Sequence, residues 1–166
     1  MPSPVGHMLG GAIVARLVAP SAVLVCAVAA VGPDIDFLWG RHTMETHSIG
    51  AMAIAGLLTF AFTRNARLST AVALAWGSHL LLDWLGSDDT PPIGIMALWP
   101  INSNYYFANA YIFESISRRY WLDNFIAHNA WAVAKEVLIL GPITFIVFAL
   151  TARWRAPRRS RRPDTA

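Results

Sequence analysis

Cysteine, lysine and charged side chains in general are scarce in this chain of 166 residues. A single cysteine, Cys26, excludes an intrachain disulfide framework. Its place in an apolar run indicates a packed residue rather than a nucleophile. Only 14% of the residues are charged, whereas 55% are hydrophobic and the mean hydropathy is +0.45. This composition argues against a soluble globular protein and is typical of a small integral membrane protein.

The basic residues are unevenly distributed along the chain. Thirteen Lys and Arg residues contribute to a net charge of +3, and six of them lie between Arg153 and Arg162. The positive-inside rule places such a tail in the cytoplasm, where it could contact anionic lipid headgroups. We expect membrane lipids as partners and no nucleic acid, because neither interleaved aromatic residues nor a recognition motif accompany the arginines. The sequence does not indicate a protein partner.

Four apolar stretches predict an all-α, polytopic membrane bundle without strands of consequence. They cover residues 5–31, 49–63, 69–85 and 130–152. A spanning helix needs about 20 residues, so the last stretch is long enough and the two middle ones are short. Residues 103–127 are rich in aromatic side chains and predict an interfacial helix or loop. We expect one integral-membrane domain over residues 1–152 and a basic, disordered cytoplasmic tail over 153–166.

The arginines also predict which loops share a face of the membrane. Arg64 and Arg67 lie in the short loop between the two middle stretches. Placing this loop and the basic tail in the cytoplasm makes the loops at 34–47 and 86–103 extracytoplasmic. The His and Asp residues of those loops then lie at the outer face.

The first apolar stretch favours a helical hairpin. A single spanning helix over residues 5–31 would leave His7 on the cytoplasmic side. A turn at residues 19–20, with Arg16 at the inner face, returns His7 and Asp34 to the same level. We therefore predict an N-terminal hairpin followed by about three further membrane helices.

His79 and Asp83 are the strongest pair of candidate ligands. Four residues apart, they project from the same face of a helix inside an apolar segment. Both side chains are costly to keep in hydrocarbon without a partner. Metal ligation satisfies the two together; the alternative is a buried hydrogen bond between them.

Two further clusters follow the first apolar stretch. Pro33 is followed by Asp34 and, two residues later, Asp36; we expect at least one of them to ligate a metal, and the alternative is that Asp34 only caps the next turn. His42 and His47 precede the second stretch, where ordinary surface histidines are the alternative. We expect His47 to ligate, and His42 to be a ligand or a proton-transfer group.

The remaining candidates lie near the two ends of the chain. His7 and His128 are located at the ends of apolar segments, and His7 could equally be an unengaged imidazole. Glu136 lies about two turns into the last helix, where a carboxylate is too short to reach the interface. Its candidate roles are metal ligand, general base, or partner of a ligating histidine.

The chemistry of this set favours a divalent metal. Histidine and carboxylate ligands without cysteine suit zinc, manganese or iron and argue against a structural thiolate zinc. More than four candidate ligands suggest two ions, which commonly bind a phosphoryl group and activate water. We expect attack of activated water on an ester or phosphoester. The alternatives are a non-catalytic membrane protein with a structural metal or a regulatory role, and a metal or proton transporter.

Four motifs together resemble a known family, the membrane-bound metal-dependent hydrolases, also described as LexA-binding, inner-membrane-associated, YdjM-like hydrolases. They are Pro-Asp-Ile-Asp at 33–36, Thr-His-Ser at 46–48, His-Leu-Leu-Leu-Asp at 79–83 and Leu-Trp-Pro at 98–100. The resemblance implies a multi-pass helical protein of the bacterial inner membrane. It also implies a hydrolase whose substrate the family does not define, and the His/Asp pattern is similar to that of zinc-dependent phospholipase C. From the clustered ligands beside interfacial aromatic residues we expect a lipid-like or phosphoester substrate.

The resemblance further implies roles for individual residues. Zinc, as one or more ions, would be held by a set of metal ligands: His7, Asp36, His47, His79, Asp83 and His128. By the same analogy Glu136 could join His128 in completing a site with more than one ion. From the residues themselves, and not from the resemblance, we expect Glu136, His42 and Asp34 to be the catalytic residues. Thr43 and Met44 replace a basic residue and a glycine that family members often have after the first histidine, which leaves the role of His42 open.

Overall fold

The computed structural model describes residues 1–39, 42–89 and 91–155. Within these ranges the protein has five α-helices, two 3-10 segments and no strand, apart from isolated bridges at Gly86–Phe113 and Ile95–Tyr106. The predicted all-α fold is confirmed for the described part of the chain. The predicted tail from residue 156 onward lies outside it, and the preceding helix continues to Arg155.

The chain begins with a helical hairpin, as predicted. Helix α1 (Pro4–Val18) has Ser3 as its N-terminal cap and Ala19 as its C-terminal cap, and Pro20 begins the next segment. The elements of the hairpin are α1, η1 (Pro20–Ala22) and α2 (Val23–Ala29), followed by η2 (Gly32–Trp39). A Cβ added at Gly11 would lie 2.3 Å from the carbonyl oxygen of Cys26, so only glycine permits this close approach of α1 and α2.

The next two helices form an antiparallel pair. Helix α3 (Ile49–Thr63) is capped by Ser48, and α4 (Ala66–Trp84) is capped by Asn65. Arg64 adopts a left-handed conformation with φ of 53°, which reverses the chain between them. Because the side chain of Asn65 can satisfy the first amide groups, α4 starts three residues earlier than its apolar stretch predicts.

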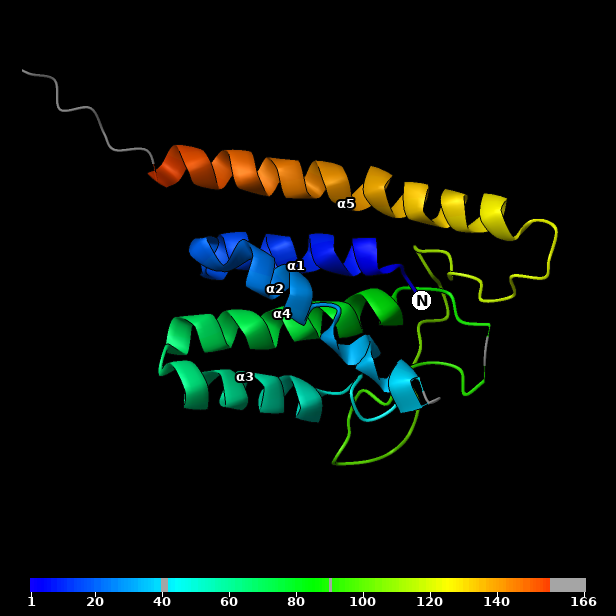
Figure 1. Ribbon diagram of the computed structural model, residues 1–166, viewed down its shortest axis with the longest axis horizontal. Helices are drawn as coiled ribbons and strands as arrows, with labels where there is room; N and C mark the ends of the chain where they lie inside the picture. The colour runs from blue at the N-terminus through cyan, green and yellow to red at the C-terminus, as the bar shows by residue number, and fades with distance from the viewer. Residues whose placement is uncertain (40–41, 90, 156–166) are drawn as a thin grey trace, which may run out of the picture.

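Helix α5 (Phe125–Arg155) packs along α1 at the edge of the bundle, and α4 lies between α1 and α3 (Figure 1). Within the described residues, two segments are long and apolar enough to cross a membrane, Pro20–Leu38 and Phe125–Arg153, while α1 and α3 are shorter apolar helices. Residues 103–124 contain turns and bends but no helix, so the loop alternative predicted for this region holds.

The two ends of the bundle differ in charge. At one end lie Arg16, the α3–α4 turn with Arg64, and the end of α5, where the Arg16 Nε donates to the Thr151 hydroxyl at 2.8 Å. At the other end lie the first turn of α1, segment η2, the last turns of α4 and the long loops (Figure 1). This second end holds the candidate ligands of α1, η2 and α4.

Candidate metal centre

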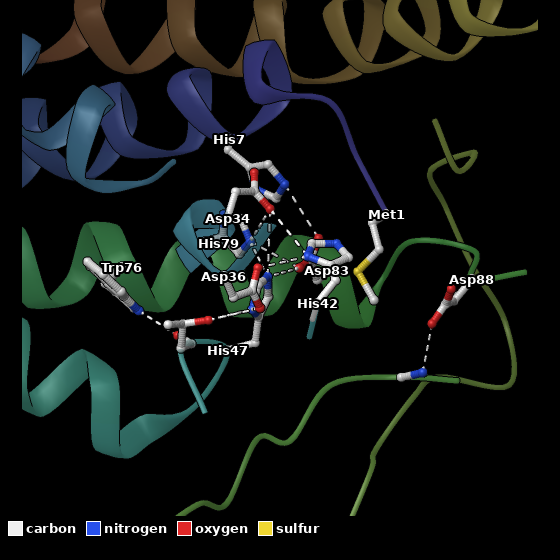
Figure 2. Close-up of polar contacts among 12 residues, drawn as sticks. Met1, His7, Asp34, Asp36, His42, His47, Trp76, His79, Asp83 and Asp88 are labelled. Atoms are coloured by element: carbon white, nitrogen blue, oxygen red, sulfur yellow. Dashed lines mark hydrogen bonds and ion pairs between the residues drawn. The ribbon is translucent and has the colours of Figure 1, made fainter. Parts of the chain in front are cut away.

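Four separate segments bring their histidine and aspartate side chains together at one end of the bundle (Figure 2). Helix α1 contributes one residue, η2 two, the loop before α3 two, and α4 two. In chain order they are His7, Asp34, Asp36, His42, His47, His79 and Asp83. The sequence predicted all seven as site residues, and the fold brings all seven together.

His79 is held in one orientation by a backbone carbonyl. Its Nδ1 lies 2.7 Å from the carbonyl oxygen of Ala30, which can only accept, so Nδ1 must carry the proton. The neutral ring then has an unprotonated Nε2. This atom lies 3.0 Å from Asp83 Oδ2, one helical turn further along α4. The arrangement is the one that a ligating histidine adopts when a carbonyl fixes its tautomer.

His47 has a corresponding arrangement. Its Nδ1 lies 3.1 Å from Asp36 Oδ2, so a neutral ring again presents an unprotonated Nε2. That atom lies 3.1 Å from the Nε2 of His79. Two lone pairs at this distance repel each other unless a proton or a metal cation lies between them.

Protonation of His47 is the metal-free solution. Burial opposes its charged form, but hydrogen bonds with Asp34 and Asp36 and the nearby Asp83 carboxylate outweigh this effect. Together they raise the pKa of His47 from 6.5 to about 9. A metal ion at the same place must therefore displace a proton at neutral pH.

Asp83 and His7 carry the buried polar atoms that lack hydrogen-bond partners among the described residues: both Asp83 oxygens and His7 Nδ1. His7 Nε2 lies 3.4 Å from Asp83 Oδ1, and the ring of His7 stacks on His79 with centroids 3.7 Å apart. Buried carboxylate oxygens without donors are costly, and a cation would satisfy them.

The geometry fits one or two metal ions. His7, His79 and Asp83 form one fully buried group whose ligand atoms lie within 4.8 Å of one another, and Asp34, His42 and His47 form a second, partly buried group. Two nitrogens bound to one tetrahedral zinc at about 2.05 Å are about 3.3 Å apart. The observed separation of 3.1 Å between the His47 and His79 Nε2 atoms is close to this value.

The two aspartates of η2 occupy positions that differ from expectation. Asp34 Oδ1 lies 3.7 Å from the Nε2 atoms of both His47 and His79, on the side where a metal would bind. Asp36 lies behind the rings, where it contacts the Nδ1 atoms of His42 and His47 and accepts from the Thr46 hydroxyl. This placement favours Asp34 as a ligand and Asp36 as the residue that orients the histidines, whereas the resemblance implies Asp36 as a ligand.

His42 lies at the more exposed edge of the centre. Its Nδ1 is 3.1 Å from Asp36 Oδ1 and 3.9 Å from Asp34 Oδ1, and its ring stacks on Phe37. It also lines an open cleft together with Arg118. Both alternatives left open by the sequence, ligand and proton-transfer group, are compatible with this position.

Glu136 is engaged away from the histidine and aspartate cluster. Its Oε1 accepts from the Ser3 amide at 2.7 Å, and its Oε2 accepts from the Ser3 hydroxyl. Ser3 is the cap of α1, and Gly6 leaves room because a Cβ there would lie 2.7 Å from Oε2. In this structure Glu136 therefore contacts the start of the helix that carries His7, and its expected role as ligand or base stays a prediction.

His128 also points to a different partner. Its Nε2 lies 2.8 Å from the Ser115 carbonyl, and the neighbouring Asn129 makes two hydrogen bonds with the backbone of Ser117. The pair thus fastens the segment at 115–117 to the first turns of α5. His128 is thus placed apart from the histidine and aspartate cluster, with its Nε2 engaged by this segment, and its expected role as a ligand stays a prediction.

Three contacts that support the centre were missed by the sequence reasoning. Ser3, directly before Pro4, carries a recognisable capping signal. The Ala30 carbonyl gives no sequence signal, because any residue could supply it. Trp76 donates from Nε1 to the Thr46 carbonyl at 2.8 Å, which fixes the loop that holds His47 (Figure 2).

Comparison with known proteins agrees with the family indicated by the motifs. Neither a curated protein nor a solved structure matches the chain. A family model described as YdjM inner membrane protein matches residues 1–159, which is nearly the whole chain and includes every residue of the centre. The chain therefore belongs to the YdjM family of inner membrane proteins.

Proposed function

We propose that this protein is a membrane-bound, metal-dependent hydrolase that cleaves an ester or phosphoester of a lipid-like substrate. One observation carries the proposal: the Nε2 atoms of His47 and His79 lie 3.1 Å apart beside a buried Asp83 whose oxygens have no hydrogen-bond partner among the described residues. Burying these side chains without a cation is energetically unfavourable. Ionisable groups held in such unfavourable surroundings are concentrated at functional sites.

Zinc is the metal that we propose, held in one or two adjacent groups. The first consists of His7, His79 and Asp83, and the second of Asp34, His42 and His47. Manganese and iron would compete for the same donors. When bound, a divalent ion polarises an ester or phosphoester and lowers the pKa of water.

The protein's own residues would orient the metal ligands and move a proton away from the attacking water. Asp36 and the Ala30 carbonyl hold His47 and His79 with their Nε2 atoms facing the centre. His42 lies between the centre and the open cleft. We propose that it ligates when the second group holds an ion, and that it accepts a proton from the attacking water when only the first group is occupied. Glu136 acts through Ser3 by fixing the start of α1.

We also propose a multi-pass arrangement in the bacterial inner membrane. The α1–α2 hairpin, α3, α4 and α5 would lie in the bilayer, with the arginine end in the cytoplasm and the metal centre at the extracytoplasmic face. The charge difference between the two ends of the bundle supports this orientation. A single cysteine introduced near the end of α5 should be labelled by a membrane-impermeant maleimide only after cells are opened; labelling in intact cells would reverse the orientation.

The hydrolase is tested with purified protein and a panel of lipids. Metal-loaded protein in detergent should cleave some phospholipid or phosphoester, and His79→Ala should lose both metal and turnover. His128→Ala is the matched control, since its ring binds the Ser115 carbonyl. Stoichiometric metal without hydrolysis across a broad panel would contradict the proposal.

A structural role for the metal is the second candidate function, and it is favoured because the ligands come from several segments of the chain. The ligands come from α1 and α4 in the first group and from η2 and the loop before α3 in the second, so ions in the two groups would cross-link four segments. Chelation would then unfold the protein, and ligand substitutions would act only through stability. A transporter ranks third, because the candidate ligands gather at one end of the bundle rather than along a path through it.

A further inference from the structure

Two open spaces of opposite character meet at the metal centre. The first is an apolar groove of about 460 Å³ between α1 and the α2–η2 segment. Its walls are Met8, Val28, Val31, Ile35, Phe37 and Leu38. Its charged lining residue is Asp34, the carboxylate that faces the Nε2 atoms of the histidines.

The second space is a polar cleft of about 280 Å³ on the other side of His42. Its charged walls are Asp88, Asp89, Arg118 and Arg119. Arg119 pairs with Asp89 at 3.9 Å, and Asp88 accepts from the Gly94 amide at 2.8 Å. The cleft thus offers two guanidinium groups beside the metal centre.

Phe37 lies where the groove and the cleft meet. Its ring lines the groove, stacks on His42 at 4.0 Å between centroids, and receives the Arg118 guanidinium 4.2 Å from its own centroid. His42 and Arg118 both line the cleft. The apolar groove, His42 of the centre and the Arg118 guanidinium therefore meet at the side chain of Phe37.

We propose that the groove holds an acyl chain of the substrate while the anionic headgroup binds at Arg118 in the cleft. The scissile bond between these two parts of the substrate would then lie beside Asp34. This inference rests on the proposed function and specifies its substrate as an amphiphile with a negatively charged headgroup. Guanidinium groups bind phosphate and carboxylate oxygens through two parallel hydrogen bonds. The exposed side chains at the groove mouth, Val28 at 58% and Leu38 at 79%, would face lipid.

A second apolar groove provides the internal control. It has a volume of about 310 Å³ and is lined by Ile54, Leu58, Trp76 and Trp99, among others. It reaches Thr46 but none of the residues in the two candidate metal groups. Leu58 is 53% exposed, close to the value for Val28, so tryptophan at either position fills one groove with a similar change in side-chain volume.

The test uses phosphatidic acid with a photoactivatable diazirine on one acyl chain, presented to the full chain in detergent micelles. We expect crosslinks on the segment from Val28 to Leu38 and on Met8. Val28→Trp should reduce them about tenfold, whereas Leu58→Trp should leave them unchanged. Arg118→Gln should also weaken crosslinking by the anionic lipid, but not by a neutral diacylglycerol with the same diazirine chain.

Other outcomes overturn the inference. Crosslinks concentrated on α3, or spread evenly over α3 and α5, would show that the groove is not a chain site. Competition by glycerol phosphate as strong as by the full lipid would show that the headgroup alone binds. Crosslinking and hydrolysis are both measured on metal-loaded wild type, because groove labelling without hydrolysis of any lipid would contradict the hydrolase while leaving the groove proposal intact. His79→Ala should keep the groove labelling and lose turnover.

Discussion

The Nε2 atoms of His47 and His79 lie 3.1 Å apart, and the Nδ1 atom of each ring is engaged by a fixed acceptor. The acceptors are an aspartate for His47 and the Ala30 carbonyl for His79. Both rings are fully buried, so water cannot separate them. The pair therefore alternates between two chemical states, one with a proton on His47 and one with a cation shared by the two nitrogens.

The first prediction concerns pH and the metal-free protein. The pKa of His47 is raised from 6.5 to about 9, so its stabilising effect is complete below pH 6.5 and is lost as pH rises through 9. The free energy of unfolding should fall over this range by on the order of 3 kcal/mol. Thermal unfolding in detergent with a chelator measures it, and His47→Gln should flatten the dependence.

Metal binding should show the opposite dependence on pH. Because the ion displaces the His47 proton, apparent affinity should increase between pH 6.5 and 9, with about one proton released per ion at neutral pH. Calorimetric titration with zinc in buffers of different ionisation enthalpy measures the proton count. Binding without proton release would mean that His47 does not ligate.

The two aspartates of η2 should behave differently when substituted. Asp34→Asn should remove a ligand and with it most of the metal of the second group. Asp36→Asn should retain the ion but weaken its binding about 10–100-fold, because the histidines lose their orienting carboxylate. Competition against a chromophoric chelator measures both affinities, and complete loss of metal in Asp36→Asn alone would restore Asp36 as a ligand.

Glu136 should act on stability and not on the metal directly. Glu136→Ala leaves the buried Ser3 amide unpaired and should lower the free energy of unfolding by about 3 kcal/mol. Glu136→Gln, which keeps an acceptor for that amide, should recover most of this loss and bind metal normally. Glu114→Ala is the control, because its ion pair with Lys135 is partly exposed and should contribute less than about 1 kcal/mol.

An inactive but stable and metal-loaded Glu136→Gln variant would contradict this role. Such a result would indicate a proton-transfer function for the carboxylate, as the sequence alone suggested.

Two glycines test the helical hairpin. Gly11→Ala places a Cβ 2.3 Å from the Cys26 carbonyl, so α1 and α2 must separate, and we expect a loss of about 1–3 kcal/mol. Gly141→Ala in α5 is the control, since the nearest heavy atom to its added Cβ lies 3.8 Å away; it should be neutral or stabilising by up to about 1 kcal/mol. Equal unfolding temperatures for the two variants would mean that the hairpin is not closely packed.

The sequence contains enough information to predict much of this architecture. Apolar stretches broken by Pro20, Arg64 and the polar loops predict the helices, and the charge distribution predicts that the hairpin returns His7 to the level of Asp34. The pair His79 and Asp83 is predicted from its spacing, because two positions four apart share one face of any α-helix.

The roles of individual carboxylates require the three-dimensional structure. Asp34 and Asp36 lie in a 3-10 segment of three residues per turn, so they point about 120° apart, and only the packing of that segment decides which faces the histidines. Glu136 and His128 lie on α5, whose contact with α1 and with residues 115–117 involves partners distant in sequence. No local pattern encodes these pairings.

Elemental analysis of the protein purified in detergent tests the metal centre most directly. Wild type and His128→Ala should each contain stoichiometric divalent metal, and His79→Ala and Asp83→Ala should each lose the ion held by the group of His7, His79 and Asp83. A folded wild type that takes up no divalent metal, even when it is supplied, would contradict the metal centre. So would equal metal in all four proteins.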